Sequence, residues 1–467
     1  MSTLPATVSG LTACLMLAVL AGVLAATGAA AAMVILLGVG VLVWTGARLS
    51  WMDVQTILLA ALLFVPDIAS GKTFDLRITW SHGLTWSNFV VPALALPLLA
   101  GAWWSGRLLL PERWPGLACG LLALLAWLLL SLGAALVAGD AILTRTGGLT
   151  VLAHAAKLAL FVLLGVALST GGTAWRQRAE RLLLGGIAIN AAAGLAQAAG
   201  WIASLSPLAQ SLPPRATGLF YDANLYGVVS AWALLWLLCQ PLPHGWRGWA
   251  GTALTVAVAG SLLAAGSRAG YLACAAGCVV LACAGRRRAV ARAAVLLTAL
   301  ALVFPARSWQ RIHAAALTVD VLIQPSSTSV PAPDASTRQR LATMHQALRQ
   351  IARHPWLGLG FGRALYLGVP GIGSGPLVPT KPFRGAQNMF LTVAAAGGMV
   401  GLALLLLAVA APLRLPDRAR RWAVAPVLAG YAGVLTACLT QEALWNARLL
   451  ALVVLLTAGI GVGWRRA

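Results

Sequence analysis

The sequence predicts an all-α polytopic membrane protein with about 12–14 transmembrane helices. Hydrophobic residues make up 60% of its 467 positions and charged residues only 9%, whereas about a quarter of a soluble domain is charged. Continuous apolar runs of about 20 residues, long enough to cross a bilayer as helices, recur along the chain. One long polar stretch, residues 306–387, separates a large group of these runs from a smaller one.

We expect about fourteen spans, or twelve if the first two runs are divided differently. The amino-terminal membrane region, residues 1–305, holds about eleven of them, and the carboxy-terminal region, residues 388–467, holds about three. Residues 1–10 carry no Lys or Arg, so the first run is expected to remain as a span rather than act as a cleaved signal peptide. The expected spans are residues 10–27, 30–47, 54–66, 88–105, 116–138, 150–169, 182–202, 223–239, 250–266, 269–285, 290–305, 388–413, 422–440 and 447–464.

Clusters of arginine between the runs predict the orientation, because Lys and Arg gather in cytoplasmic loops. With fourteen spans, the clusters within residues 176–181, 286–288, 414–421 and 465–466 all fall on one side of the membrane. That side is predicted to be the cytoplasm, which places residues 306–387 in a long loop on the outer side.

The formal net charge of +22 would indicate nucleic-acid binding in a soluble protein. Here the cytoplasmic arginine clusters account for much of it, and no nucleic-acid partner is expected. The seven cysteines all lie in apolar runs, which favours core packing over disulfides or metal ligation. Neither His nor an acidic residue accompanies Cys274 and Cys278, so we expect no metal site and no cofactor.

The predicted outer loop carries cations that the topology does not require. Lys and Arg are normally sparse on that side of a membrane protein, so their number here favours an anionic substrate. The nine cations are Arg307, Arg311, Arg338, Arg340, Arg349, Arg353, Arg363, Lys381 and Arg384.

An amphipathic helix is predicted inside this loop, over residues 337–353, with Ser336 as its cap. Arg338 and Arg340 lie off its apolar stripe, and the helix is expected to rest on the membrane face or on the protein. The stripe consists of Leu341, Met344, Leu348 and Ile351.

Residues 215–226 (RATGLFYDANLY) lead from the outer side into the expected span that begins at residue 223. Asp222 can cap that helix, whose free N–H groups face outward. Capping does not explain Arg215 or Asn224, which favours a further role for this stretch.

Residues 265–270 (AGSRAG) form the outer turn between two expected spans. Their small side chains let the two backbones approach closely, and this places Arg268 near the membrane plane. An ionisable residue at that depth indicates a functional site.

Taken in order, these stretches resemble the motifs of the O-antigen ligase/polymerase family of bacterial envelope glycosyltransferases. Residues 215–224 match R-x-T-G-x-F-x-D-x-N, residues 266–269 match G-S-R-(G/A), and residues 354–362 match H-P-x-x-G-x-G-x-G. Residues 387–401 match H-N-x(9)-G-x-x-G apart from the first position, where Gln387 stands in place of His.

The resemblance implies a GT-C-like glycosyltransferase that works at the periplasmic face of the bacterial inner membrane. Such proteins transfer a glycan from undecaprenyl pyrophosphate to a hydroxyl of lipid A-core, of another glycan repeat or of a protein. This chemistry serves lipopolysaccharide or exopolysaccharide biosynthesis. The expected partners are therefore the lipid-linked glycan donor, one of these acceptors and the lipid bilayer.

Breaking a sugar–pyrophosphate bond requires that the departing pyrophosphate be stabilised by a divalent metal or by guanidinium groups. The predicted outer segments hold no carboxylate pair at metal-ligand spacing, so metal-independent transfer is expected. Arg offers two donors matched to phosphate oxygens and keeps its charge near lipid. Arg215 and Arg268 are the first candidates for binding pyrophosphate, followed by Arg338 and Arg340.

In the family that this sequence resembles, the His at the position of Gln387 is a candidate general base. Glutamine does not take up a proton at neutral pH, so the identity of the base is left open here. Glu442, Asp222 and His345 are the other catalytic candidates, unless the leaving pyrophosphate itself accepts the proton. For Glu442 the competing explanation is a salt bridge to Arg448 or to a loop arginine. Ligase and polymerase activities are both open, and a non-catalytic glycan or lipid transporter or assembly subunit is the alternative from another class.

Overall fold

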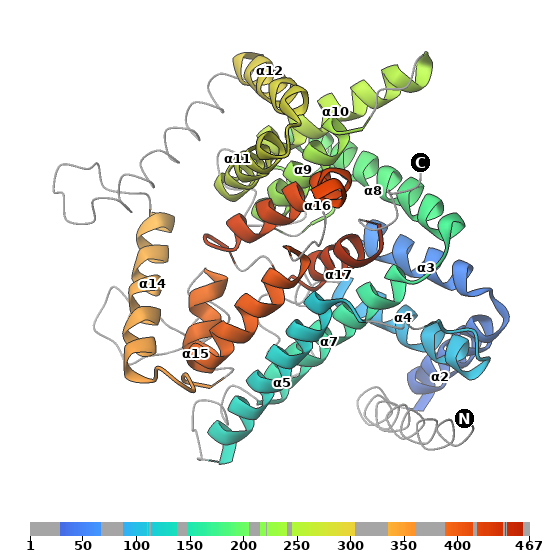
Figure 1. The fold of residues 1–467 in the computed structure, drawn as a ribbon. Coiled ribbons are helices and arrows are strands. Elements are labelled where there is room, and N and C mark those ends of the chain that lie inside the picture. Colours follow the sequence, from blue (N-terminus) through green and yellow to red (C-terminus); the bar gives the residue numbers. More distant parts are fainter. Residues whose placement is uncertain are drawn as a thin grey trace.

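The structure of the protein is a computed structural model, and it describes residues 29–66, 87–109, 111, 114–137, 148–204, 215–220, 222–240, 245–303, 335–360, 388–413, 418–441, 444 and 446–460. Every regular element within these residues is a helix (Figure 1). The helices of the first half are α2 (Ala29–Arg48), α3 (Trp51–Phe64), α4 (Ser87–Trp104), α5 (Gly116–Val137), α7 (Gly148–Ser169) and α8 (Thr173–Ala198). Those of the second half are α9 (Ala223–Leu238), α10 (Trp246–Ala265), α11 (Arg268–Cys283), α12 (Arg287–Val303), α14 (Ala335–Arg353), α15 (Met389–Ala410), α16 (Arg418–Ala437) and α17 (Ala447–Leu455).

The predicted all-α polytopic membrane protein is confirmed. Within the described part of the chain, four helices are long and apolar enough to cross a membrane, and shorter apolar helices accompany them. The four cover Gly116–Ala134, Thr173–Ala198, Gly248–Ala265 and Met389–Leu413. The expected span 10–27 lies outside the described residues, so the count of 12–14 spans stays a prediction.

Two local predictions are wrong. The helix expected from residue 182 begins at Thr173, so the predicted basic turn at residues 176–181 is helical, and Arg178 pairs there with Asp53 at 2.9 Å. Helix α14 begins at Ala335, so Ser336 lies inside its first turn and does not cap it.

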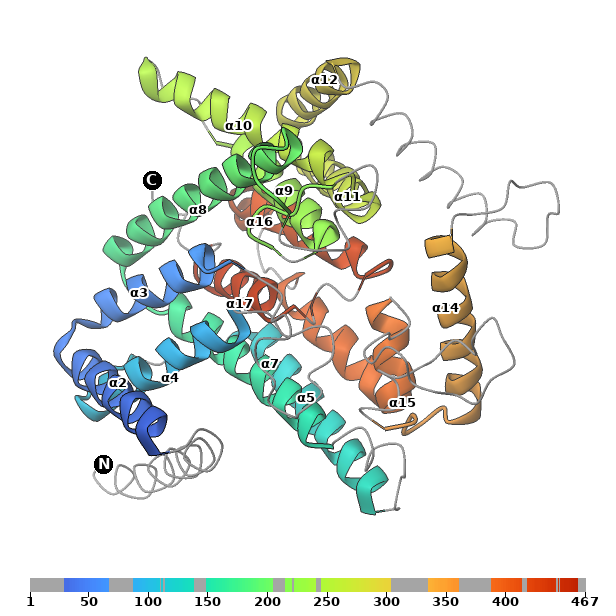
Figure 2. The same ribbon diagram turned by 180° about the vertical axis from the view of Figure 1, so that it is seen from behind.

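Helix α14 buries small side chains that lie next to the predicted apolar stripe. Thr343 and Ala347 are fully buried, whereas Leu348 is 50% exposed. The helix packs against α15 at the edge of the molecule in both views (Figures 1 and 2). Of the predicted stripe, Ile351 is partly buried and packs against the core.

Four helices, α9, α10, α11 and α16, pack together around small residues. A Cβ added to Gly270 would lie 2.8 Å from the backbone of Gly227, which shows how closely α9 and α11 approach. Because neither glycine carries a Cβ, the two helix backbones come into contact near their amino-terminal ends. This contact positions the stretches that lead into α9 and α11.

Candidate functional site

Two turns that lie far apart in the sequence meet at the amino-terminal ends of α9 and α11. The Nε of Arg215 donates to the carbonyl oxygen of Ala265 at 2.9 Å, and its Nη2 donates to Asn224 Oδ1 at 2.7 Å. Ser267 Oγ lies 3.4 Å from the same Asn224 oxygen. The guanidinium of Arg215 therefore joins the turn that contains Arg268 to the first turn of α9. We call these two segments, residues 215–220 and residues 265–270, the arginine turns.

Each of the two helices has a side-chain cap. Asp222 accepts a hydrogen bond from Asn224 N at 2.7 Å, which confirms its predicted capping role. Ser267 accepts from Gly270 N at 3.0 Å, and the preceding Gly266 has the left-handed backbone (φ 52°) that reverses the chain after α10. Arg268, the first residue of α11, is partly exposed beside these helix ends.

The stretch before α9 is held in place by amide side chains of α8. Gln197 Oε1 accepts from the backbone N–H groups of Thr217 and Gly218, each at 2.8 Å. Asn190 Oδ1 accepts from Leu219 N at 2.7 Å. The N–H groups of Thr217 and Gly218 are buried, and the two amides satisfy this stretch where no regular secondary structure does. We did not predict Asn190 or Gln197 from the sequence, although a polar side chain inside an apolar helix is itself a signal.

The amino-terminal end of α15 lies at the same end of the helix group. Helices α11 and α16 run antiparallel, because Gly277 lies against Ala429 and Gly433 lies against Ala273. The same register, continued by one turn, places the end of α16 beside Arg268. Met389 N donates there to Cys438 O at 2.9 Å. Asn388, which caps α15 through Leu391 N at 3.1 Å, therefore lies next to the end of α16.

The stretch that begins at His354 docks into a bend of α15. Gly398 has φ 66° and ψ −163° inside this helix, and Figure 1 shows α15 as two pieces that meet at an angle. Leu359 N donates to Ala395 O at 2.8 Å and Gly360 N donates to Ala396 O at 3.0 Å. The docking stretch thus satisfies carbonyl groups that the broken helix leaves without partners.

Of the other predicted site residues, His345 has a described side chain. His345 is exposed on α14, a helix that packs against α15. Arg338 and Arg340 lie in the first half of α14, and their side chains are outside the described part of the structure. Gln387 and Glu442 also lie outside the described residues, so the base and the expected Glu442 salt bridge stay predictions.

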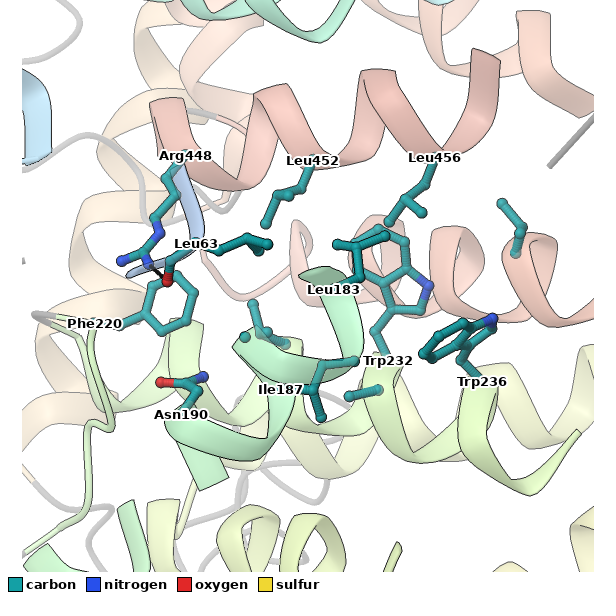
Figure 3. Close-up of a pocket in the computed structure, with 14 residues that line it drawn as sticks. Leu63, Leu183, Ile187, Asn190, Phe220, Trp232, Trp236, Arg448, Leu452 and Leu456 are labelled. Atoms are coloured by element: carbon teal, nitrogen blue, oxygen red, sulfur yellow. Dashed lines mark hydrogen bonds between the residues drawn. The ribbon is translucent and has the colours of Figure 1, made fainter. Parts of the chain in front are cut away.

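An apolar cavity has Phe220, from the stretch that begins at Arg215, in its lining. Phe220, Asn190 and Arg448 lie at one end of it, and Trp236 and Leu456 at the other (Figure 3). Its walls come mainly from α8, α9 and α17. The stretch that carries Arg215 at its start thus contributes Phe220 to the polar end of an apolar space, an arrangement suited to a ligand with a charged head and a hydrocarbon chain.

A protein-family model described as O-antigen ligase matches residues 253–406. The match includes the Arg268 turn, the stretch from His354 and the bend at Gly398. A comparison with curated proteins gave no significant match. Arg215 lies outside the matched residues, but its hydrogen bond to Ala265 joins it to them. Over the residues that the structure describes, the chain is therefore a helical membrane protein, and its residues 253–406 match the O-antigen ligase family model.

Proposed function

We propose that the protein transfers a glycan from undecaprenyl pyrophosphate to an acceptor hydroxyl at the periplasmic face of the bacterial inner membrane. The observation that carries the proposal is the meeting of the Arg215 and Arg268 turns at two capped helix ends. Guanidinium groups and helix amino termini both favour phosphate. The O-antigen ligase match supports glycan transfer as the reaction.

In this reaction the acceptor oxygen attacks the anomeric carbon, and the bond from that carbon to the pyrophosphate oxygen breaks. The pyrophosphate leaves with the electron pair, so negative charge grows on it in the transition state. Arg215 is already oriented by Ala265 and Asn224, and a donor group fixed before the reaction stabilises such charge most effectively. We assign Arg215 and Arg268 to the leaving pyrophosphate, with Arg338 and Arg340 as supporting cations, and no metal ion.

The apolar cavity supports a donor that carries a lipid chain. Its wall is formed by Leu183, Ile187, Trp232 and Leu452, among others. An isoprenoid chain is favoured in such a space because its binding removes apolar surface of both the chain and the cavity wall from water. The first isoprene units next to the pyrophosphate would therefore lie in this cavity, beside Phe220.

The proton of the acceptor hydroxyl passes to a base or to the leaving pyrophosphate. Among the residues that the structure describes, Asp222 is the carboxylate next to the arginine turns, but it also caps α9. Glu442, Gln387 and His345 remain the other candidates. The acceptor, which separates ligase from polymerase, is lipid A-core, a second glycan repeat or a protein.

The test uses purified full-length protein in liposomes with undecaprenyl-pyrophosphate glycan, each of the three acceptors in turn, and excess EDTA. We expect release of undecaprenyl pyrophosphate and a gain of one glycan mass on one acceptor. Gain of mass on lipid A-core identifies a ligase, and growth of the glycan identifies a polymerase. Donor that stays intact with every acceptor, in EDTA and in added Mg²⁺, would overturn the proposal.

A further inference from the structure

Arg448 is a buried cation in the first turn of α17. Its side chain is only 3% exposed, and it lies in an apolar helix whose other residues are all buried. Removing a guanidinium from water is costly unless its charge and its donors are matched. The contacts that match them therefore indicate what this residue does.

Two of the contacts that offset the burial of Arg448 hold helices together. Arg448 Nε donates to Leu62 O at 2.5 Å, and Nη2 donates to Leu63 O. These are carbonyl groups of the last turn of α3, where a positive charge is favoured by the helix dipole. This pair of contacts ties α17 to α3 and needs no further explanation.

Other contacts of Arg448 reach the stretch that follows Arg215. Arg448 Nη1 donates to Leu219 O at 3.3 Å, and its guanidinium carbon lies 4.7 Å from the centre of the Phe220 ring. The N–H group of Leu219 is held by Asn190. The N–H and C=O groups of Leu219 are thus both held by buried side chains, the first by Asn190 of α8 and the second by Arg448 of α17.

We propose that Arg448 is a positioning residue that holds residues 215–220, and through them Arg215, at the polar end of the apolar cavity. The inference rests on the proposed function of Arg215. Three residues separate Leu219 from Arg215, and Gln197 holds the two residues that come before Leu219. Without Arg448 the stretch keeps its contacts to α8 but loses the contacts to α17, so the Arg215 guanidinium is placed less accurately.

The kinetic test is a double-mutant cycle in full-length protein in liposomes. Arg448→Met is expected to lower kcat/KM for the lipid-linked donor by about 10- to 100-fold, as misplacement of a catalytic group by about 1 Å does. In an Arg215→Ala background the same change should cost less than about threefold, because the group that it positions is gone. An equal loss in both backgrounds would overturn the proposal.

The second readout is hydrogen–deuterium exchange at the amides of Thr217, Gly218 and Leu219. Arg448→Lys keeps the charge but lacks the planar fork that spans three carbonyl groups, so exchange there should rise about tenfold. Unchanged exchange would contradict the positioning role. This variant also replaces Arg448→Met in the cycle if the latter does not fold.

Gln55→Met is the matched control. Gln55 is fully buried and donates to the carbonyl groups of Ala167 and Thr170 at the end of α7, so it resembles Arg448 without touching the stretch. It should lower thermal stability while leaving exchange at residues 217–219 and the donor kinetics unchanged. If Arg215→Ala itself transfers normally, the proposed function of Arg215 fails, and the exchange experiment still decides whether Arg448 holds the stretch.

Discussion

The arginine turns and the stretch docked into α15 are both motif segments, but different features hold them in place. At the arginine turns, side chains satisfy the backbone: Gln197 and Asn190 bind residues 217–219, and Arg215 binds Ala265. At α15, backbone pairs with backbone, and the decisive residue is a glycine, Gly398. The first region presents charged side chains, and the second allows two pieces of chain to approach closely.

This difference predicts that replacing an arginine of the first region and replacing the glycine of the second have different effects. We propose that Arg215 and Arg268 contact the leaving pyrophosphate, so their replacement is expected to act on chemistry. A Cβ on Gly398 would lie 2.0 Å from Trp356 O, so its replacement is expected to act on the fold. Three predictions test this separation.

The largest effect is expected from Arg215→Ala and Arg268→Ala. Each should lower kcat for glycan transfer by roughly 10²–10³-fold, as the loss of one preset donor to a developing anion does. Arg353→Ala, which removes an exposed cation at the end of α14, is the matched control and should stay near wild type. The assay is release of undecaprenyl pyrophosphate, and transfer that continues unchanged in both arginine variants would show that neither binds the leaving group.

The next effect is expected from Gly398→Ala, which should destabilise the protein rather than alter a reacting group. The positive φ alone costs about 1–3 kcal/mol for a residue with a side chain, and the contact with Trp356 O adds to it. Gly401→Ala is the control, because its nearest neighbour would lie at an ordinary 3.4 Å. Thermal unfolding in detergent measures both, and equal midpoints would show that the bend is not specified by Gly398.

The smallest effect on stability is expected from Asp222→Asn. Asparagine caps helices as well as aspartate does, so the free energy of unfolding should change by less than about 0.5 kcal/mol. If Asp222 only caps α9, transfer also stays within a few-fold of wild type. A large loss of kcat at unchanged stability would instead identify Asp222 as the base, and the arginine turns would then supply both charge stabilisation and proton transfer.

The sequence predicted most helices because hydropathy is a local property. The helices near residues 30–47, 116–138 and 223–239 were predicted to within one residue or so at each end. It failed at α8, where arginines that resembled a loop form the first turns of a helix and Arg178 finds a partner in Asp53. Local composition does not show such a partner, which lies 125 positions away.

The candidate site was predictable in part. Spacing and residue type singled out Arg215, Asp222 and Arg268, which lie together at two helix ends. Asn190 and Gln197 were not predicted, because their role depends on the distant backbone groups that they face. For the same reason, the hydrogen bonds of Arg448 to distant carbonyl groups were not predicted.

By itself, the sequence determined the membrane character, the helical class and the order of the motifs, since each of these depends on neighbouring residues. Only the tertiary structure decided that Arg215 bonds across 50 positions to Ala265 and that Arg448 reaches Leu219 across 229 positions. It also decided that Gly398 makes room for Trp356. A buried carbonyl or N–H group must find a partner wherever the fold provides one, and that choice is made by packing rather than by proximity along the chain.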